Sequence, residues 1–236
     1  MRLTENQLRD IIRNIILREG AVTPEQLNDD YTVVIKDNGI LYMRLASLGR
    51  VDLVQRFGHL DPDTIMKMAS YSIYFKYRYN NPKLSERVEE IFGELEMRKW
   101  DGLCNDAWEV YWAEVHKDYE AGGFGPLMYD IAMELAGKHG LMCDRNSVSN
   151  EAARLWNHYL QLRTDVFSED IDIDKCPSDM LSSSDEIAIR KGADHPWHQK
   201  VYFSTYYVSG NQKPVMDGLN RAGRIEYIHH RYPGEK

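Results

Sequence analysis

The sequence predicts a mixed α/β fold, and three consecutive stretches predict it. A strand-like segment, residues 107–115, is followed by a glycine-rich turn at residues 122–125 and by an amphipathic helix over residues 126–136. A short apolar strand over residues 141–143 and a second helix over residues 150–162 come next. Alternation of strands and helices along a chain is typical of α/β architecture.

The helix over residues 126–136 is defined by its two ends and by its apolar spacing. Pro126 suits the first helical position, where a missing N–H is not needed, and Gly137 ends the helix. The preceding glycines let the backbone approach an anion closely, and the positive end of the helix dipole favours negative charge. The turn and the helix together therefore predict a phosphate-binding cradle. The apolar residues at helical spacing are Leu127, Met128, Ile131, Ala132, Leu135 and Ala136.

Strands and a further helix are expected before this unit. Two strand-like runs, residues 31–36 and 40–45, flank an Asn-Gly pair at residues 38–39, which is a strong hairpin signal. Apolar residues at core spacing predict a helix over residues 82–97. The aromatic cluster at residues 71–79 contains two cations that could accompany base stacking, but a structural role is favoured for it.

The composition changes at about Val166. Residues 168–185 are acidic and rich in turn-forming residues, which predicts an exposed connection. Residues 201–208 then have the pattern of a strand, and residues 214–222 have the pattern of a helix. The C-terminal part therefore adds at least one strand and one helix.

The composition of the 236-residue chain excludes several classes of protein. A hydrophobic fraction of 43% with 28% charged residues is typical of a globular protein and excludes disorder throughout. The net charge of -8, with no long Lys/Arg run, argues against a general nucleic-acid binder. No apolar run approaches the ~18 residues that a membrane span needs. We therefore expect neither nucleic acid nor a membrane as a partner.

Cysteine and histidine usage sets two further expectations. Cys104, Cys143 and Cys176 are too few and too scattered for a disulfide framework, so we expect reduced thiols in a cytosolic protein. The histidine pairs 195/198 and 229/230 have no Cys or further His nearby to complete a tetrahedral site. No metal is therefore expected.

The first nineteen residues predict a separate amphipathic helix, which begins with a capping box at Thr4. Its apolar residues are periodic and interrupted by charges, unlike those of a secretory signal. We divide the chain into this leader, residues 1–19, and one domain, residues 20–236, with its core at 31–165 and closing elements at 166–236. The apolar stripe consists of Leu8, Ile11, Ile12, Ile15 and Ile16.

Strand, glycine turn, helix, strand and helix in this order resemble the GNAT superfamily of acetyl-CoA-dependent N-acetyltransferases, over residues 31–165. The turn of that family reads R/Q-x-x-G-x-G/A, and residues 120–125 read Glu-Ala-Gly-Gly-Phe-Gly. The resemblance implies a twisted, mostly antiparallel sheet with flanking helices, in which residues 201–208 match the last hairpin. It also implies acetyl-CoA as a cosubstrate, with transfer of the acetyl group to an amine of a small molecule or a protein.

The resemblance also implies roles for individual residues. The preceding strand presents the acetyl group, with a backbone amide at Val115 or the next residue polarising its carbonyl, and the turn holds the CoA pyrophosphate. Glu109 and Glu114 are the candidates for the general base, and because they are five apart they face opposite sides of a regular strand. The cofactor-binding set is Val115, Gly122, Gly123, Phe124, Gly125, Leu127 and Ser149.

The end of the leader carries a second resemblance. Leu17-Arg18-Glu19 followed by Gly20 is similar to the cleavage site of prohead maturation proteases in large tailed bacteriophages, which remove helical capsid-targeting leaders. This implies a bacteriophage protein that contacts prohead components through residues 1–19. It implies a location in the host-cell cytoplasm, with packaging in the virion as an alternative. The other interpretation is a helix that packs on the domain or mediates self-association.

Three residues depart from the N-acetyltransferase pattern. Glu120 stands where the family has Arg or Gln beside the pyrophosphate, and Pro126 removes one amide from the donor row. Trp156 stands where a Tyr often protonates the departing thiolate, which leaves Tyr159, about one turn further on, as the candidate acid. These departures favour the alternative function, a non-catalytic phage particle or assembly protein that retains the fold.

Overall fold

The computed structural model describes eight parts of the chain, and the structural statements below concern these parts. They are residues 22–44, 65–81, 86–100, 104–144, 148–171, 176, 204–208 and 213–229. The predicted leader helix, residues 1–19, lies outside them, as do the histidines at 195 and 198.

The described strands form one eight-stranded sheet in the order β6-β7-β5-β4-β3-β2-β1-β8. The pairs β4 with β5 and β1 with β8 are parallel, and the other five neighbouring pairs are antiparallel. The prediction of a mixed α/β fold with a mostly antiparallel sheet and flanking helices is confirmed. The strands are β1 (Tyr31–Arg44), β2 (Ile65–Asn81), β3 (Glu86–Trp100), β4 (Trp108–Val115), β5 (Leu141–Met142), β6 (Val166–Asp170), β7 (Ser204–Val208) and β8 (Ile225–His229).

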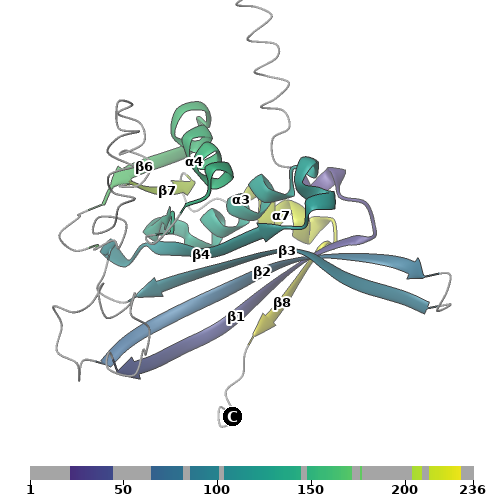
Figure 1. The fold of residues 1–236 in the computed structure, drawn as a ribbon, viewed down its shortest axis with the longest axis horizontal. Helices are drawn as coiled ribbons and strands as arrows, with labels where there is room; N and C mark the ends of the chain where they lie inside the picture. The colour runs from purple at the N-terminus through teal and green to yellow at the C-terminus, as the bar shows by residue number, and fades with distance from the viewer. Residues whose placement is uncertain are drawn as a thin grey trace, which may run out of the picture.

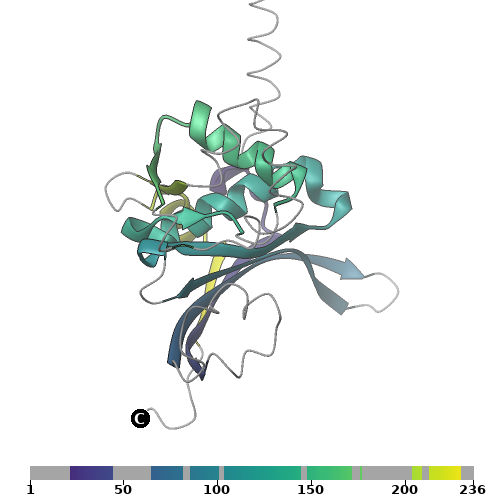
Figure 2. The same ribbon diagram turned by 60° about the vertical axis from the view of Figure 1, so that its left-hand side comes forward.

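The three α-helices of the described chain lie on one face of this sheet (Figures 1 and 2). They are α3 (Phe124–Ala136), α4 (Asn150–Leu162) and α7 (Pro214–Arg221). The core lies between α3 and the strands, because apolar side chains of both are almost completely buried there. Each such side chain stabilises the fold by roughly 1.5–3 kcal/mol through the area removed from water. The aliphatic side chains among them that are less than 2% exposed include Ile73, Leu95, Met97, Leu127, Met128, Ile131 and Met133.

The predicted hairpin at residues 38–39 is wrong, because the chain does not reverse there. Tyr31–Arg44 is one strand that pairs along its whole length with β2. The register shifts by one residue between Asp37 and Ile40, and Gly39, at φ 75°, lies in this bulge. A type I′ turn needs positive φ at both central residues, whereas Asn38 is not among the residues with positive φ. The long partner strand lets the Asn-Gly pair form a bulge instead of a turn.

The predicted helix over residues 82–97 is also wrong, because residues 86–100 form strand β3. Gly93, Leu95 and Met97 are buried in strand alternation, whereas Ile91 is 54% exposed. A register shift between Phe75 and Lys76 of β2 leaves Phe92 as the extra residue of a bulge in β3. This extra residue breaks the period of two and produces apolar spacing similar to that of a helix.

Other boundaries agree more closely with expectation. The second helix is confirmed at Asn150–Leu162, and α7 ends one residue before the predicted boundary. The strand predicted at residues 201–208 is described from Ser204 onward. The expected connection after Val166 is wrong for its first residues, because Val166–Asp170 form strand β6, which pairs with β7. The strand can carry acidic residues because most of its side chains, including those of Glu169 and Asp170, are exposed.

A carboxylate of α3 connects helix α7 to the core through hydrogen bonds. The two carboxylate oxygens of Glu134 accept the backbone N–H groups of Val215 and Met216, each at 2.8 Å. These are first-turn donors of α7 that have no acceptor within their own helix. Only 3% of Glu134 is exposed, and its burial raises its pKa to about 7. Glu134 therefore caps α7 across more than eighty residues of sequence.

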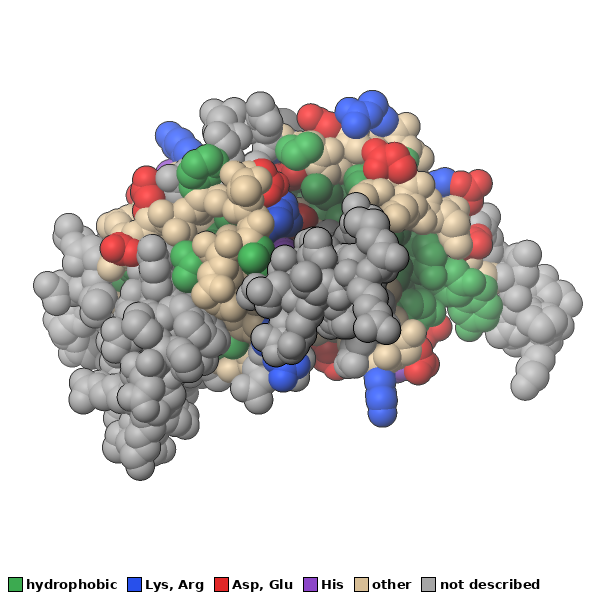
Figure 3. Space-filling model, turned by 90° about the horizontal axis from the view of Figure 1, so that it is seen from above, with side chains coloured by type: hydrophobic (Ala, Val, Ile, Leu, Met, Phe, Trp, Pro, Cys, Tyr) green, Lys and Arg blue, Asp and Glu red, His purple; other side chains and the backbone are tan. Residues whose placement is uncertain are grey.

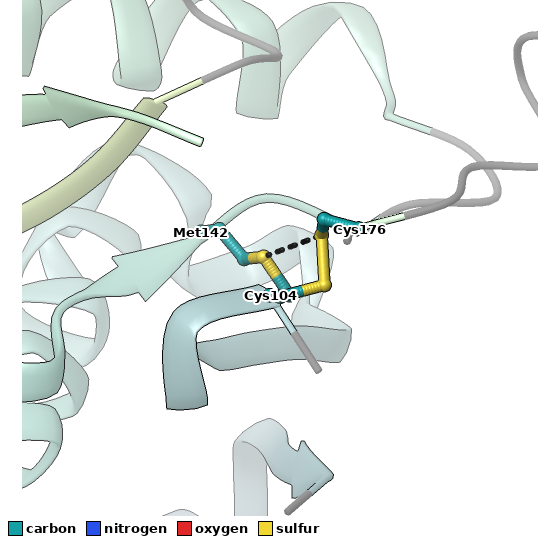
Figure 4. Close-up of a disulfide and its surroundings, with 3 residues drawn as sticks. All are labelled: Cys104, Met142 and Cys176. Carbon is teal, nitrogen blue, oxygen red and sulfur yellow. Dashed lines mark hydrogen bonds between the residues drawn. A yellow bond between two sulfur atoms is a disulfide. The ribbon is translucent and has the colours of Figure 1, made fainter. Parts of the chain in front are cut away.

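The expectation of reduced thiols is wrong for two of the three cysteines, because Cys104 and Cys176 form a disulfide (Figure 4). Their Cα atoms are 4.3 Å apart although 72 residues separate them in sequence. The sulfur of Met142 lies 3.9 Å from that of Cys176. Cys143 is buried and is not part of a disulfide. Scattered spacing in sequence gave no sign of this pairing, because only the folded sheet brings the two segments together.

No helix in the described ranges is long and apolar enough to cross a membrane. Seen from the helix-covered side, acidic and basic side chains of the described residues are interspersed over the surface (Figure 3).

Candidate functional site

The turn between β4 and α3 is built on glycines with different local requirements. A short 3-10 helix, Lys117–Gly122, leads to Gly123, which has a left-handed conformation (φ 73°, ψ 11°) and precedes the first residue of α3. A side chain at Gly122 would meet the Phe124 ring at 2.7 Å. A Cβ at Gly125, in contrast, would have no neighbouring atom within 4 Å. The first two glycines therefore serve the turn itself, whereas Gly125 leaves open space beside the helix end.

The first turn of α3 carries backbone N–H groups that point back along the helix axis, at the end of the helix where Gly125 lies. The helix begins at Phe124, two residues before the predicted start, so Pro126 is its third residue. Leu127 N–H is already bonded to the Gly123 carbonyl at 3.3 Å, and Pro126 has no N–H. Phe124 and Gly125 therefore carry the N–H groups without an acceptor inside the helix. Together with the helix dipole, these two groups favour an anion.

An aromatic cluster anchors the turn on the sheet. The Phe124 ring centroid lies 4.8 Å from that of Phe92 and 5.7 Å from that of Phe75, both in edge-to-face geometry. Tyr119, in the 3-10 helix, stacks on Phe92 at 4.2 Å. Edge-to-face and offset aromatic pairs contribute about 0.5–1.5 kcal/mol each beyond area burial. The position of the helix end is therefore set by packing under it.

One edge of β4 is paired for only part of its length. Its parallel pairing with β5 consists of two residue pairs, Trp108 with Leu141 and Glu109 with Met142. Beyond them, β4 continues to Val115 with β3 as its only partner in the sheet of the described chain. His116 N–H donates to the Phe92 carbonyl at 2.6 Å, toward β3. Since successive N–H groups alternate in a strand, Val115 N–H points to the other side, along the partly paired edge.

The two glutamates of β4 share one face of the sheet, contrary to the expectation for a regular strand. Glu109 pairs with Arg98 and Glu114 pairs with Glu94, two positions of β3 that face the same way. The register shift between Glu96 and Met97 leaves Tyr111 as an extra residue, which changes the alternation. The Arg98 guanidinium lies 3.2 Å from the centre of the Tyr111 ring. Both carboxylates therefore lie on the face opposite α3, with Glu109 buried and Glu114 exposed.

Tyr159 lies beside the first turn of α3, but its hydroxyl is already bonded. The side chain is 1% exposed, and the hydroxyl donates to the Pro126 carbonyl at 3.2 Å. Burial, and then the nearby charge of Asp130, raise its pKa well above the ordinary value. Trp156 is a core residue that packs on the Tyr129 and Tyr206 rings. The structure thus brings Tyr159 to the turn without exposing it to the open space at Gly125.

Ser149, placed by sequence in the cofactor-binding set, is the N-cap of α4. Its hydroxyl accepts the Ala152 N–H at 3.1 Å. This hydrogen bond is the usual one for a serine at the N-cap of a helix. Sequence reasoning placed Val115, Gly123, Phe124, Gly125 and Leu127 around one turn, and the structure brings these residues together there. It missed the bulge at Tyr111, for which no sequence signal exists.

No group of three or more His, Cys, Asp or Glu side chains in the described ranges is arranged to hold a metal ion. Comparison of the chain with protein-family models and with curated proteins gives no match.

Proposed function

We propose that this chain is an acetyl-CoA-dependent N-acetyltransferase with the GNAT fold. The observation that carries the proposal is the short pairing of β4 with β5, over two residues only, which leaves the rest of the β4 edge, leading to the turn before α3, without a second partner among the described strands. An extended ligand with amide groups can bond to such a strand edge, and an anion can bind at the helix end next to it. The pantetheine arm and the pyrophosphate of CoA combine these two features.

The residues at the turn fit such a molecule. The N–H groups of Phe124 and Gly125 face the space where a pyrophosphate would lie, and no side chain obstructs it at Gly125. Val115 N–H would contribute at the strand edge, where a thioester carbonyl needs a hydrogen-bond donor. Pro126 leaves this cradle with one amide fewer than a helix end with another residue there.

Acetyl-CoA supplies the activated acetyl group when bound, and the chain must hold it and move protons. The nitrogen of a neutral amine forms the new bond to the carbonyl carbon, and the amine loses a proton. The carbon–sulfur bond breaks, and CoA leaves as a thiolate that takes up a proton to become the free thiol. Glu114 and Glu109 are the candidates to accept that proton, directly or through water. Glu114 is exposed and accessible to an incoming amine, whereas Glu109 is buried behind the strand surface.

Binding tests the proposal first. We expect CoA to stabilise the protein against thermal unfolding, and we expect Gly125→Val to abolish this stabilisation by blocking the helix end. The variant should fold normally, because the added side chain meets open space. Ala222→Val, at an exposed position after α7, is the control that should retain the effect of CoA. Absence of stabilisation of the unmodified chain by millimolar CoA would refute the cofactor assignment.

A second candidate function is a non-catalytic phage particle or assembly protein with the same fold. The bonded hydroxyl of Tyr159 favours it, because neither Tyr159 nor Trp156 offers a free acid at the cradle. Turnover distinguishes the two functions. Binding of CoA without release of free thiol, measured with acetyl-CoA and a panel of primary amines, would favour the non-catalytic protein. Release of thiol that depends on an amine would favour the enzyme.

A further inference from the structure

A pocket of about 250 Å³ lies between α7 and the corner of the sheet made by β2, β1 and β8. Its position separates it from the cradle, because Leu135, near the C-terminal end of α3, lines it, whereas the cradle lies at the N-terminal end. Ten residues of helix between Gly125 and Leu135 correspond to roughly 15 Å. The pocket is thus a second candidate site, independent of the proposed acetyl transfer.

The sheet side of the pocket consists of two cross-strand rows. Asp37 of β1 pairs with Tyr71 of β2 and with His229 of β8, so these three side chains are neighbours on one face. Ile35 lies in the next row, beside Tyr227 of β8. Directly paired side chains in a sheet have Cβ atoms about 4.5–5.5 Å apart. The floor therefore combines one carboxylate, polar ring groups and one buried aliphatic side chain.

The helix side of the pocket is one face of α7. Lys213, Met216, Asp217 and Asn220 all line it, and their spacing of three and four places them on the same side of the helix. Asp217 therefore faces the pocket from the side opposite Asp37, and Lys213 faces it from the N-terminal end of α7. The N–H groups of Val215 and Met216 do not contribute, because they are bonded to Glu134.

These walls carry both signs of charge around an aliphatic patch. Two carboxylates on opposite sides suit an ammonium group, and the raised pKa of Tyr71, caused by burial and then by Asp37, agrees with a negative environment at that end. Lys213 at the end of the helix suits a carboxylate. Ile35, Met216 and Leu135 supply apolar contacts. The volume is close to the lower end of the range for small-molecule sites, about 300 Å³.

We propose that this pocket binds a free amino acid with an apolar side chain, whose ammonium group lies between Asp37 and Asp217 and whose carboxylate lies at Lys213. Both ends of the ligand are recognised, so a molecule that has only one of the two charges should bind weakly. The aliphatic walls select the side chain.

Isothermal titration calorimetry on the full chain tests the proposal, with L-leucine, L-methionine and L-phenylalanine as probes. We expect at least one to bind, and we expect its amide (cation only) and its des-amino acid (anion only) to bind at least tenfold more weakly. Asp37→Asn and Asp217→Asn should each weaken binding at least tenfold. Asp37→Asn keeps the oxygen that accepts the Gly39 N–H, so it should fold. Lys213→Ala should weaken binding of the amino acid but not of its amide.

Asp170→Asn is the matched control, because Asp170 is exposed on β6, at the opposite end of the strand order. The Asp170→Asn variant should bind the amino acid with the same affinity as the unmodified chain. Absence of binding by all three amino acids at millimolar concentration would overturn the proposal. Equal affinity for the amino acid and its amide would also overturn it, as would unchanged affinity in both aspartate variants.

Discussion

Replacement of Glu134 by Gln should change how the stability of the protein depends on pH. The carboxylate caps α7 through two backbone N–H groups, and its pKa is raised from 4.5 to about 7 by burial, against the lowering effect of those two hydrogen bonds. Asp130 and Asp217 are the nearby charges that raise it further. A folded-state pKa above the unfolded one means that the native protein keeps this proton to higher pH than the unfolded chain.

The sign and size of the pH effect on stability follow from this difference between the two pKa values. The contribution to stability is complete below pH 4.5 and is lost as pH rises to about 7, where the native carboxyl also ionises. The difference between 4.5 and about 7 corresponds to about 3 kcal/mol, at ~1.36 kcal/mol per pKa unit. About 2.5 kcal/mol of this loss falls between pH 5 and pH 8. Gln cannot ionise, so the unfolding free energy of the Glu134→Gln variant should not fall by this amount between pH 5 and pH 8.

Urea unfolding at pH 5 and pH 8 measures the effect. Relative to the unmodified chain, Glu134→Gln should gain about 2.5 kcal/mol of unfolding free energy between the two pH values. Met216→Leu leaves Glu134 and both backbone N–H groups in place and alters only a buried apolar side chain of α7, so its difference in unfolding free energy from the unmodified chain should be the same at both pH values. If the difference for Glu134→Gln were also independent of pH, Glu134 would not titrate between these values, and the account of its burial would be refuted.

Three further predictions concern the site, the disulfide and the leader. Glu109→Gln or Glu114→Gln should lower the rate of acetyl transfer ~100-fold or more, with little change in CoA affinity, because loss of a general base acts on the transition state. Small and equal effects of the two substitutions would mean that the base is another group. The double variant Cys104→Ser and Cys176→Ser should have an unfolding free energy about 4 kcal/mol lower, the value that the chain-entropy model gives for a 72-residue separation. Urea unfolding without reductant measures the difference. An unchanged midpoint would mean that the two thiols are reduced in solution. A chain that begins at Gly20 should unfold at the same urea concentration as the full chain, whereas a loss of several kcal/mol would show that the stripe of residues 8–16 packs on the domain. If the protein enters a phage particle, as the resemblance of its leader implies, the packaged chain should begin at Gly20; a chain that still begins at Met1, or absence of the protein from particles, would refute processing after Glu19.

The sequence predicted most closely those elements whose signals are local. The strand–turn–helix unit around Gly123 was placed within two residues, because glycine conformation and helix periodicity are properties of neighbouring residues. Both helices after it were found for the same reason. Residues 31–45 and 82–97 were misjudged because each contains a bulge. A bulge is decided by the partner strand, which a local pattern does not contain.

Arrangements that depend on residues distant in sequence could not be predicted either. The shared face of Glu109 and Glu114 depends on the extra residue Tyr111, and the capping role of Glu134 depends on a helix eighty residues away. The strand Ile225–His229 gave no clear signal because four of its five residues are exposed, so it shows no alternation. The sequence thus predicted the strand, turn and helix on which the cradle is proposed, and it gave no sign of the pocket beside α7.

The position of β8 has a consequence for synthesis of the protein. This strand pairs in parallel with Val33 to Asp37 of β1, and Val33, Val34 and Ile35 are each at most 2% exposed. On the ribosome, β1 is made early and β8 about 190 residues later, which is roughly 10–40 s at ordinary elongation rates. Until β8 arrives, an apolar strand edge is available to other chains. Nascent chains truncated before Arg224 should therefore aggregate through β1, and the yield of folded protein should depend on completion of the last strand.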